Sequence, residues 1–190
     1  MKQIENHTPD WYARRDRLVA FLLKEAASLD PCYRPSRRKA AGEFKKNDVI
    51  DTVLRTLSNL ATLGRDARSG PAKLLNRLMS EGALVELNTA TDAGAWQKKV
   101  TNEHPLPINE IWQRLCTDEA FRTADRLWQA LEEYPMVTVL KEEDRNIAPD
   151  LRARSGPGRC SFPMAPKLAV TPGNMFRARR RADRGTGLTA

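Results

Sequence analysis

The sequence predicts a mainly α-helical protein with a small β-hairpin or sheet (α+β), followed by a disordered basic C-terminal tail. Two observations predict the helices: apolar residues recur at three- and four-residue spacing, and capping residues precede several of these runs. A third predicts the tail, because proline, glycine and arginine replace the periodic pattern after residue 147. We therefore expect a single helical domain over 1–147, with a basic loop over 30–47, and a tail over 148–190.

The first half of the expected domain has clear helix start and stop signals. Thr8 can cap the N-terminus of a first helix, and Pro9 suits the first position of that helix. A second helix is expected between an Asn47 cap and a Gly64 stop, since its apolar residues form a wide stripe. A shorter third helix is expected to begin near residues 69–71 and to end at Gly82, with Leu74, Leu75, Leu78 and Met79 as its apolar residues. Together these helices are expected to supply much of the core.

The second half is expected to mix strands and helices. Residues 83–87 and 96–101 alternate in polarity and surround a small polar turn, which predicts a β-hairpin. Pro107 is expected to open a helix, and Thr117 to cap the next one. Residues 136–140 (MVTVL) form the clearest strand pattern in the chain.

Positive charge is concentrated at the two ends of the chain. The 190 residues contain 32 Lys+Arg and 24 Asp+Glu, for a net charge of +8. Residues 1–47 hold 11 basic and 6 acidic side chains, residues 48–147 hold 12 and 16, and residues 148–190 hold 9 and 2. This balance excludes an acidic, solvating disordered protein. It favours a protein that reaches for an anionic partner with a loop or a tail.

Two basic segments are the predicted nucleic-acid contacts. The loop interleaves its cations with Tyr33 and Phe44, which suits phosphate binding combined with base stacking. The tail contains an arginine-rich run. The alternatives are a mobile surface loop and a solvated tail that raises solubility. The predicted binding residues are Arg34, Arg37, Arg38, Lys39, Lys45 and Lys46 in the loop, and Arg177, Arg179, Arg180, Arg181 and Arg184 in the tail.

The sequence contains no features of export or of membrane insertion. No apolar run follows the N-terminus, and the longest one, from Leu18 to Leu23, falls far short of the roughly 20 residues of a bilayer span. Cys32, Cys116 and Cys160 are odd in number and lack zinc-ligand spacing. We therefore expect free thiols, a cytoplasmic location and no membrane partner.

Glu103 and His104 form the one candidate catalytic pair. They precede Pro105 and Pro107 at a predicted strand-to-helix junction, where a histidine beside a carboxylate can act as a general base. Glu103 or Asn102 could also help to hold a divalent metal. The alternative is a structural histidine at a proline-flanked helix start. The chain lacks the glycine-rich phosphate-binding motifs GxGxxG and GxxxxGK[ST].

The pattern E-H-x-x-P, followed by a helix, a helical hairpin and a β run into K-E-E-D-R, resembles a group of bacterial and phage proteins. Over residues 96–147 it is also reminiscent of the HNH (His-Me finger) nucleases. That resemblance implies a metal-dependent endonuclease centred on His104. The chain departs from the nuclease pattern, because the strand between the histidine and the helix is absent and Asn109 is its only candidate asparagine ligand.

The sequence thus favours a nucleic-acid-associated binding protein that contacts phosphates electrostatically. The expected partner is DNA or RNA, or a protein complex bound to nucleic acid, and no cofactor is expected. An HNH-like nuclease using a divalent metal is the first alternative. A protein-binding inhibitor or adaptor is the second. A phage or mobile-element origin would fit the size of the chain and its tail.

Overall fold

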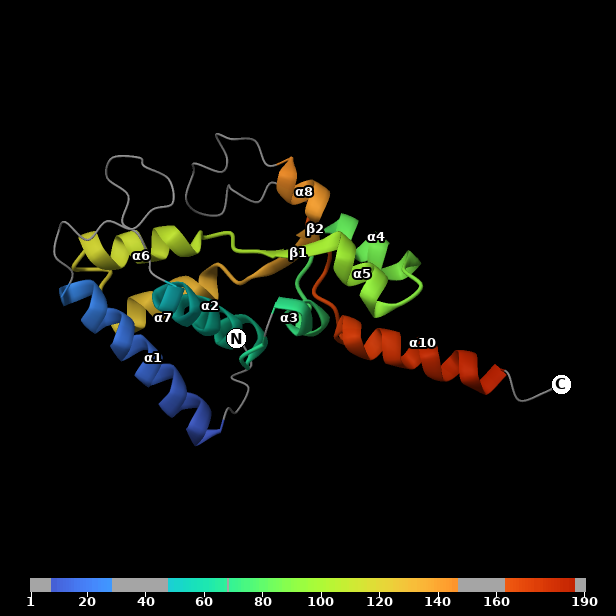
Figure 1. Ribbon diagram of the computed structural model, residues 1–190, viewed down its shortest axis with the longest axis horizontal. Helices are drawn as coiled ribbons and strands as arrows, with labels where there is room; N and C mark the ends of the chain where they lie inside the picture. Colours follow the sequence, from blue (N-terminus) through green and yellow to red (C-terminus); the bar gives the residue numbers. More distant parts are fainter. Residues whose placement is uncertain (1–7, 29–47, 68, 147–162, 187–190) are drawn as a thin grey trace. The chain divides into compact units, whose positions relative to one another are not determined.

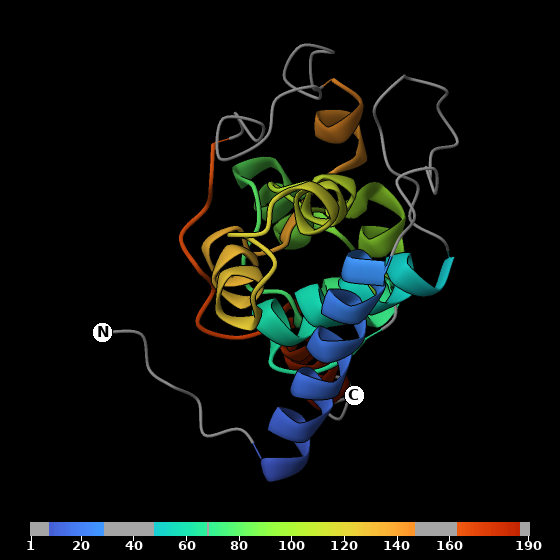
Figure 2. The ribbon, with the colours of Figure 1, turned by 90° about the vertical axis from the view of Figure 1, so that its left-hand side faces the viewer.

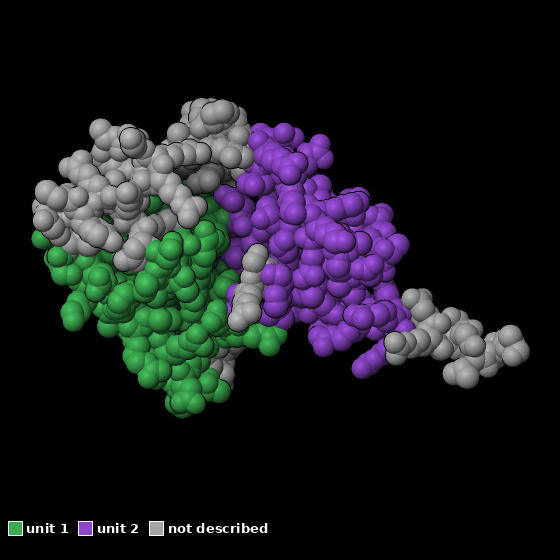
Figure 3. All heavy atoms as spheres, in the orientation of Figure 1, with its two compact units in different colours: residues 1–66, 104–135, 154–157 green, residues 67–103, 136–153, 158–190 purple. Residues whose placement is uncertain are grey.

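The computed structural model describes residues 8–28, 48–67, 69–146 and 163–186 (Figure 1). It confirms the mainly helical class with a small two-stranded sheet. The chain forms two compact units, each assembled from separate stretches of sequence (Figure 3). The predicted domain over 1–147 is therefore shared between them. Unit 1 comprises residues 1–66, 104–135 and 154–157, and unit 2 comprises residues 67–103, 136–153 and 158–190.

The described helices of unit 1 are α1 (Pro9–Ser28), α2 (Asp48–Leu63), α6 (Ile108–Thr117) and α7 (Ala124–Glu133). Helix α1 begins at the predicted residue, and the Trp11 N–H donates to the Thr8 carbonyl at 2.9 Å. Gly64 follows α2 with a φ of 70°, a conformation that costs glycine little. The predicted boundaries of the first two helices are therefore confirmed.

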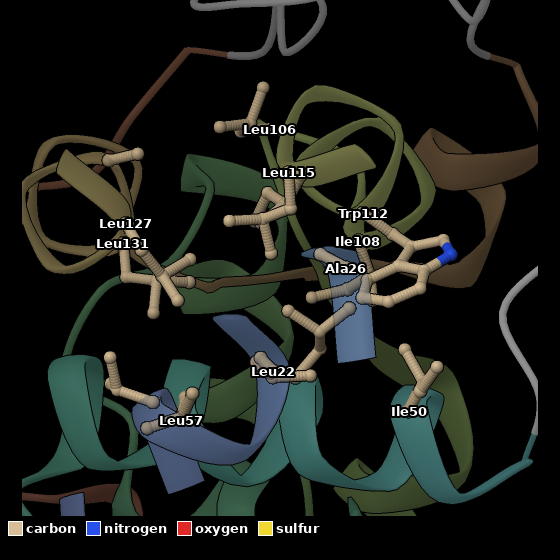
Figure 4. Packing of buried hydrophobic residues seen from close by; sticks show 14 of the residues in the cluster. Leu22, Ala26, Ile50, Leu57, Leu106, Ile108, Trp112, Leu115, Leu127 and Leu131 are labelled. Carbon is tan, nitrogen blue, oxygen red and sulfur yellow. The ribbon is translucent and has the colours of Figure 1, made fainter. Parts of the chain in front are cut away.

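The core of unit 1 forms where the apolar stripes of these four helices meet (Figures 2 and 4). Leu22 of α1, Leu54 and Leu57 of α2, Trp112 of α6 and Leu127 of α7 are all fully buried. Within each of these helices the buried residues recur every three or four positions, as Val19, Leu22 and Ala26 do in α1. This is the periodicity that predicted the helices. Hydrophobic burial of these stripes is the main source of stability in this unit.

Helix α7 begins later than the sequence analysis expected. Thr117 is the last residue of α6, and the N-cap of α7 is Thr123, whose side chain accepts from the Arg126 N–H at 3.3 Å. A turn separates the helices, because the Asp118 carboxylate accepts from the Ala120 and Phe121 N–H groups at 2.9 and 3.2 Å. The prediction that Thr117 caps this helix is therefore wrong.

Unit 2 combines short helices with the sheet. Strand β1 runs antiparallel to β2, with Val100 opposite Leu140 and Glu103 opposite Val137. The predicted strand over 136–140 is confirmed. The described elements of unit 2 are α3 (Ser69–Leu75), α4 (Glu81–Thr89), α5 (Ala93–Lys99), β1 (Val100–Glu103), β2 (Val137–Leu140), α8 (Lys141–Arg145) and α10 (Pro172–Thr186).

The predicted hairpin of 83–87 and 96–101 is wrong, because helices α4 and α5 occupy most of these residues. Side-chain caps account for both helices. The Ser80 hydroxyl accepts from the Ala83 N–H at 3.1 Å, and the Asp92 carboxylate accepts from the Gly94 and Ala95 N–H groups at 2.7 and 2.9 Å. The bonds at Asp92 lower the pKa of its carboxyl below the usual value.

The prediction that the third helix continues to Gly82 is wrong, because α3 ends at Leu75 and residues 76–80 form a ribbon in the middle of unit 2, in which Asn76, Met79 and Ser80 are buried. On one side, the Thr138 N–H donates to the Leu78 carbonyl at 2.9 Å, and the Ser80 N–H donates to the Thr138 carbonyl at 3.0 Å. On the other side, the Ala165 N–H donates to the Met79 carbonyl at 3.1 Å. The ribbon therefore joins the sheet to the C-terminal segment of the chain.

Polar side chains complete the hydrogen bonding of this ribbon. The buried Asn76 amide donates to the Met136 carbonyl at 3.0 Å and to the Thr138 hydroxyl at 3.2 Å. The Thr138 hydroxyl donates in turn to the Asn102 side chain at 2.9 Å, which reaches β1. The Ser80 hydroxyl donates to the Glu143 carboxylate at 2.5 Å and so holds α8.

The structure corrects the prediction of a disordered tail for residues 163–186. Residues 163–168 hydrogen-bond along the ribbon, and residues 172–186 form helix α10. This part of the sequence carries no periodic apolar stripe, because only two residues, Met175 and Phe176, supply the apolar contacts of helix α10 to the core of unit 2. Residues 148–162 and 187–190 of the predicted tail lie outside the described residues.

We predict that Asn76→Ala lowers the free energy of unfolding by about 1–3 kcal/mol, because the buried Thr138 hydroxyl and Met136 carbonyl lose a donor. Urea unfolding followed by circular dichroism measures this loss. Asn146→Ala is the matched control, since Asn146 is exposed and its substitution should cost less than about 0.5 kcal/mol. Equal stabilities of the two variants would contradict the role assigned to Asn76.

Candidate nucleic-acid interface

The predicted nucleic-acid contacts fall into two groups in the structure. All six loop residues, Arg34, Arg37, Arg38, Lys39, Lys45 and Lys46, lie outside the described residues. Four of the five tail arginines, Arg177, Arg179, Arg180 and Arg181, have described side chains, and all four lie on helix α10. Arg184 belongs to the same helix, but its side chain is not among those described. Helix α10 is therefore the candidate interface that the structure defines.

Helix α10 starts with the same signal as α1. Thr171 precedes Pro172, as Thr8 precedes Pro9. The Thr171 carbonyl accepts from the Asn174 and Met175 N–H groups at 2.9 and 3.1 Å. The pair Thr171-Pro172 is thus a sequence signal for the start of this helix, although the sequence-based prediction did not include it.

The inner face of α10 packs closely against the rest of unit 2. A Cβ atom on Gly173 would lie 3.2 Å from the Leu74 carbonyl oxygen, so glycine permits the close approach of α10 to α3. Three residues further on, Phe176 is 2% exposed, and its ring centroid lies 6.2 Å from that of the buried Trp96. These contacts fix which face of α10 points away from unit 2.

Arg179 lies on the inner side of the helix and is engaged there. Its guanidinium donates to the Leu87 carbonyl at 2.9 Å, and lies 5.4 Å from the centroid of the Phe176 ring. Leu87 belongs to the last turn of α4, where helical carbonyls lack a partner within the helix. Arg179 therefore fastens α10 to α4, which distinguishes it from Arg177, Arg180 and Arg181.

Three arginines remain on the outer face. Arg177, Arg180 and Arg181 are exposed, and their spacing of three and four residues places them on one side of the helix. The Arg177 guanidinium donates to the Asn174 side chain at 2.8 Å. In Figure 1 the C-terminal half of α10 extends past α3 and α5. We call the side of α10 that carries these three arginines its outer face. Because all three side chains are exposed, this face is accessible to a partner.

Ion pairing separates these three arginines from other basic residues. Arg14 pairs with Asp66 at 2.8 Å, and Arg114 pairs with Glu110 at 2.6 Å. By contrast, no carboxylate among the described residues pairs with an arginine of the outer face of α10. Residues 172–182 also contain no acidic residue. The positive charge of Arg177, Arg180 and Arg181 is thus not neutralised by a carboxylate among the described residues.

A half-buried lysine shows the opposite arrangement. Lys73 of α3 donates to the Gln97 carbonyl at 3.0 Å and to the Val100 carbonyl at 2.6 Å, at the end of α5. Desolvation lowers the pKa of its ammonium group, and the charge of Lys141 lowers it further. Lys73 therefore holds α3 against α5 and is not a candidate for phosphate binding.

The candidate catalytic pair lies where the chain passes from unit 2 to unit 1. Glu103 ends strand β1 in unit 2, and the next residue, His104, begins a segment of unit 1. Both side chains are half-buried, and Pro107 precedes α6, where its carbonyl accepts from the Ile111 N–H at 3.1 Å. Among the described residues, no three His, Cys, Asp or Glu side chains form a group that could hold a metal ion. The catalytic role of the pair stays a prediction.

One cysteine of the three is described. Cys116 is a half-buried free thiol in α6, and burial raises its pKa to about 11. At neutral pH this thiol is protonated and therefore a weak nucleophile.

None of the described helices is long and apolar enough to span a bilayer.

Comparisons with known proteins add no relative to this description. No family model matches the sequence, and neither a curated protein nor a solved structure matches the chain significantly.

We predict that Phe176→Ala loosens α10 and accelerates tryptic cleavage after Arg177, Arg180 and Arg181. Removing a buried phenylalanine costs about 3–5 kcal/mol of packing, and a protease cuts a helix when the helix opens locally. Mass spectrometry of timed digests measures the cleavage rates at each arginine. Ala178→Ser on the exposed side is the matched control and should leave these rates unchanged. If the two variants are cleaved alike, Phe176 does not anchor the helix.

Proposed function

We propose that the protein binds nucleic acid through its phosphates, with the outer face of α10 as a contact surface. The observation that carries this proposal is the division of α10 into two faces. Phe176 and Arg179 hold the inner face to unit 2, while Arg177, Arg180 and Arg181 stay exposed without a described carboxylate partner. The basic loop over 30–47 is the second contact in this proposal.

The chemistry of the exposed groups supports a phosphate ligand. A guanidinium is planar, remains charged at all physiological pH values and can donate two parallel hydrogen bonds to one phosphate. Three such groups on a docked helix lose less conformational freedom on binding than three groups on an unfolded chain would. Release of condensed counterions from the nucleic acid then supplies the driving force.

This mechanism requires no cofactor and gives little sequence preference, because contacts to phosphate do not read bases. The partner is DNA or RNA, free or already in complex with another protein. The nuclease centred on His104 remains a separate hypothesis, and the binding experiment tests it when Mg²⁺ or Mn²⁺ is included.

We predict that the logarithm of the binding constant falls linearly with the logarithm of salt concentration, with a slope of at least about −2 to −3 for three arginine contacts. Fluorescence anisotropy with labelled DNA and RNA measures this slope. The double variant Arg180→Ala/Arg181→Ala should bind more weakly to all sequences and make the slope shallower by about 1–2.

Arg145→Ala provides the control for net charge, because Arg145 is an exposed arginine of unit 2 on helix α8. It should retain the wild-type slope within error. Because the control removes one charge and the α10 variant removes two, a loss in the control that is half of the loss in the α10 variant would mean that only total charge matters. Binding that does not depend on salt would contradict the proposal, and metal-dependent cleavage that His104→Ala abolishes would establish the nuclease instead.

A further inference from the structure

The outer face of α10 also points to one form of nucleic acid. We propose that this face binds the backbone of a double helix in preference to a single strand. The inference rests on the proposed function, because it specifies the ligand of the same surface. Two independent features carry it: the lack of a stacking side chain and the density of positive charge.

The first feature is the burial of the aromatic residue of α10. Proteins that bind single strands combine cations with exposed aromatic side chains, on which the unpaired bases stack. Phe176 is the one aromatic residue in 172–186, and it is packed between Trp96 and Arg179. The outer face of α10 therefore offers phosphate contacts and no platform for a base. A duplex, whose bases are already stacked, loses nothing by this absence.

The second feature is the spacing of the charges. Arg177, Arg180 and Arg181 lie within five residues, which corresponds to about 7 Å along the helix axis. A duplex presents about one negative charge per 1.7 Å of axis, so roughly four phosphates lie within that length. A single strand with the stacked spacing of about 3.4 Å presents roughly two. The duplex therefore presents about twice the negative charge to the three guanidinium groups that a single strand presents over the same length.

The duplex and the single strand can be compared directly. Anisotropy is measured for the full chain with a labelled duplex and with its separated strand, both about 20 nucleotides long, at three salt concentrations. We expect the duplex to bind at least about fivefold more tightly, with the steeper salt dependence that its higher charge density produces. The variant Arg180→Ala/Arg181→Ala should reduce this preference.

A gain-of-function variant tests the stacking argument separately. Ala178→Trp places an aromatic ring on an exposed position three residues before Arg181, and it should tighten single-strand binding about fivefold or more, since stacking on one base contributes about 1–3 kcal/mol. Ala178→Ser is the matched control and should leave both affinities unchanged.

The outcomes distinguish this inference from the proposed function. Salt-dependent binding in which the single strand is equal to or tighter than the duplex overturns the duplex preference and leaves phosphate binding intact. If Ala178→Trp gives no gain on the single strand, the stacking argument is wrong. Absence of salt-dependent binding to both ligands overturns the proposed function together with the inference.

Discussion

The hydrogen bonding of the ribbon over 76–80 is the constraint on which unit 2 depends. The N–H and C=O groups of a buried backbone segment need partners, and this segment bonds to Thr138 of β2 on one side and to Ala165 and Leu168 on the other. Asn76 and Ser80 extend the same bonding through their side chains to β1 and to α8. Hydrophobic contacts alone would leave the order of these segments weakly specified, because such contacts are not directional.

The position of α10 is a consequence of this ribbon. Residues 163–168 follow its edge and deliver the chain to Thr171, where the helix starts. Repulsion between the three arginines on its outer face opposes the folding of α10. The intrinsic helix propensity of this segment is therefore a weak source of stability. Phe176 and Arg179 offset that repulsion with contacts to α5 and α4. The exposed charge is thus maintained by the contacts that Phe176 and Arg179 of the same helix make with unit 2.

Sequence reasoning succeeded where local signals and burial agree. The helices around Leu22, Leu54 and Trp112 combine a long apolar stripe with a cap or a proline at the start, and strand 137–140 is rich in valine. It failed over 83–99, because a short apolar run suits a strand and a helix equally well and the decisive caps, Ser80 and Asp92, are single polar residues.

The candidate site was predictable in composition and not in geometry. The arginine-rich run was visible in the sequence, but its division into an engaged Arg179 and an exposed Arg177, Arg180 and Arg181 depends on the tertiary partners Leu87 and Trp96. Leu87 lies 92 positions from Arg179, and Trp96 lies 80 positions from Phe176, so no local pattern relates these partners to α10. The roles of the basic loop and of Glu103 and His104 remain predictions.

The alternation of the chain between the two units has a consequence for the order of folding during synthesis. All described helices of unit 1 precede residue 136, so its core can close while the ribosome is still producing the rest of the chain. Unit 2 must wait, because the ribbon has neither of its neighbouring segments until β2 and residues 163–168 have emerged. Until then the apolar side chains of Met79, Leu87 and Trp96 lack their final cover. A nascent chain stopped before Phe176 would therefore present a folded unit 1 joined to an incomplete unit 2 with exposed apolar surface. Chaperones bind intermediates of this kind.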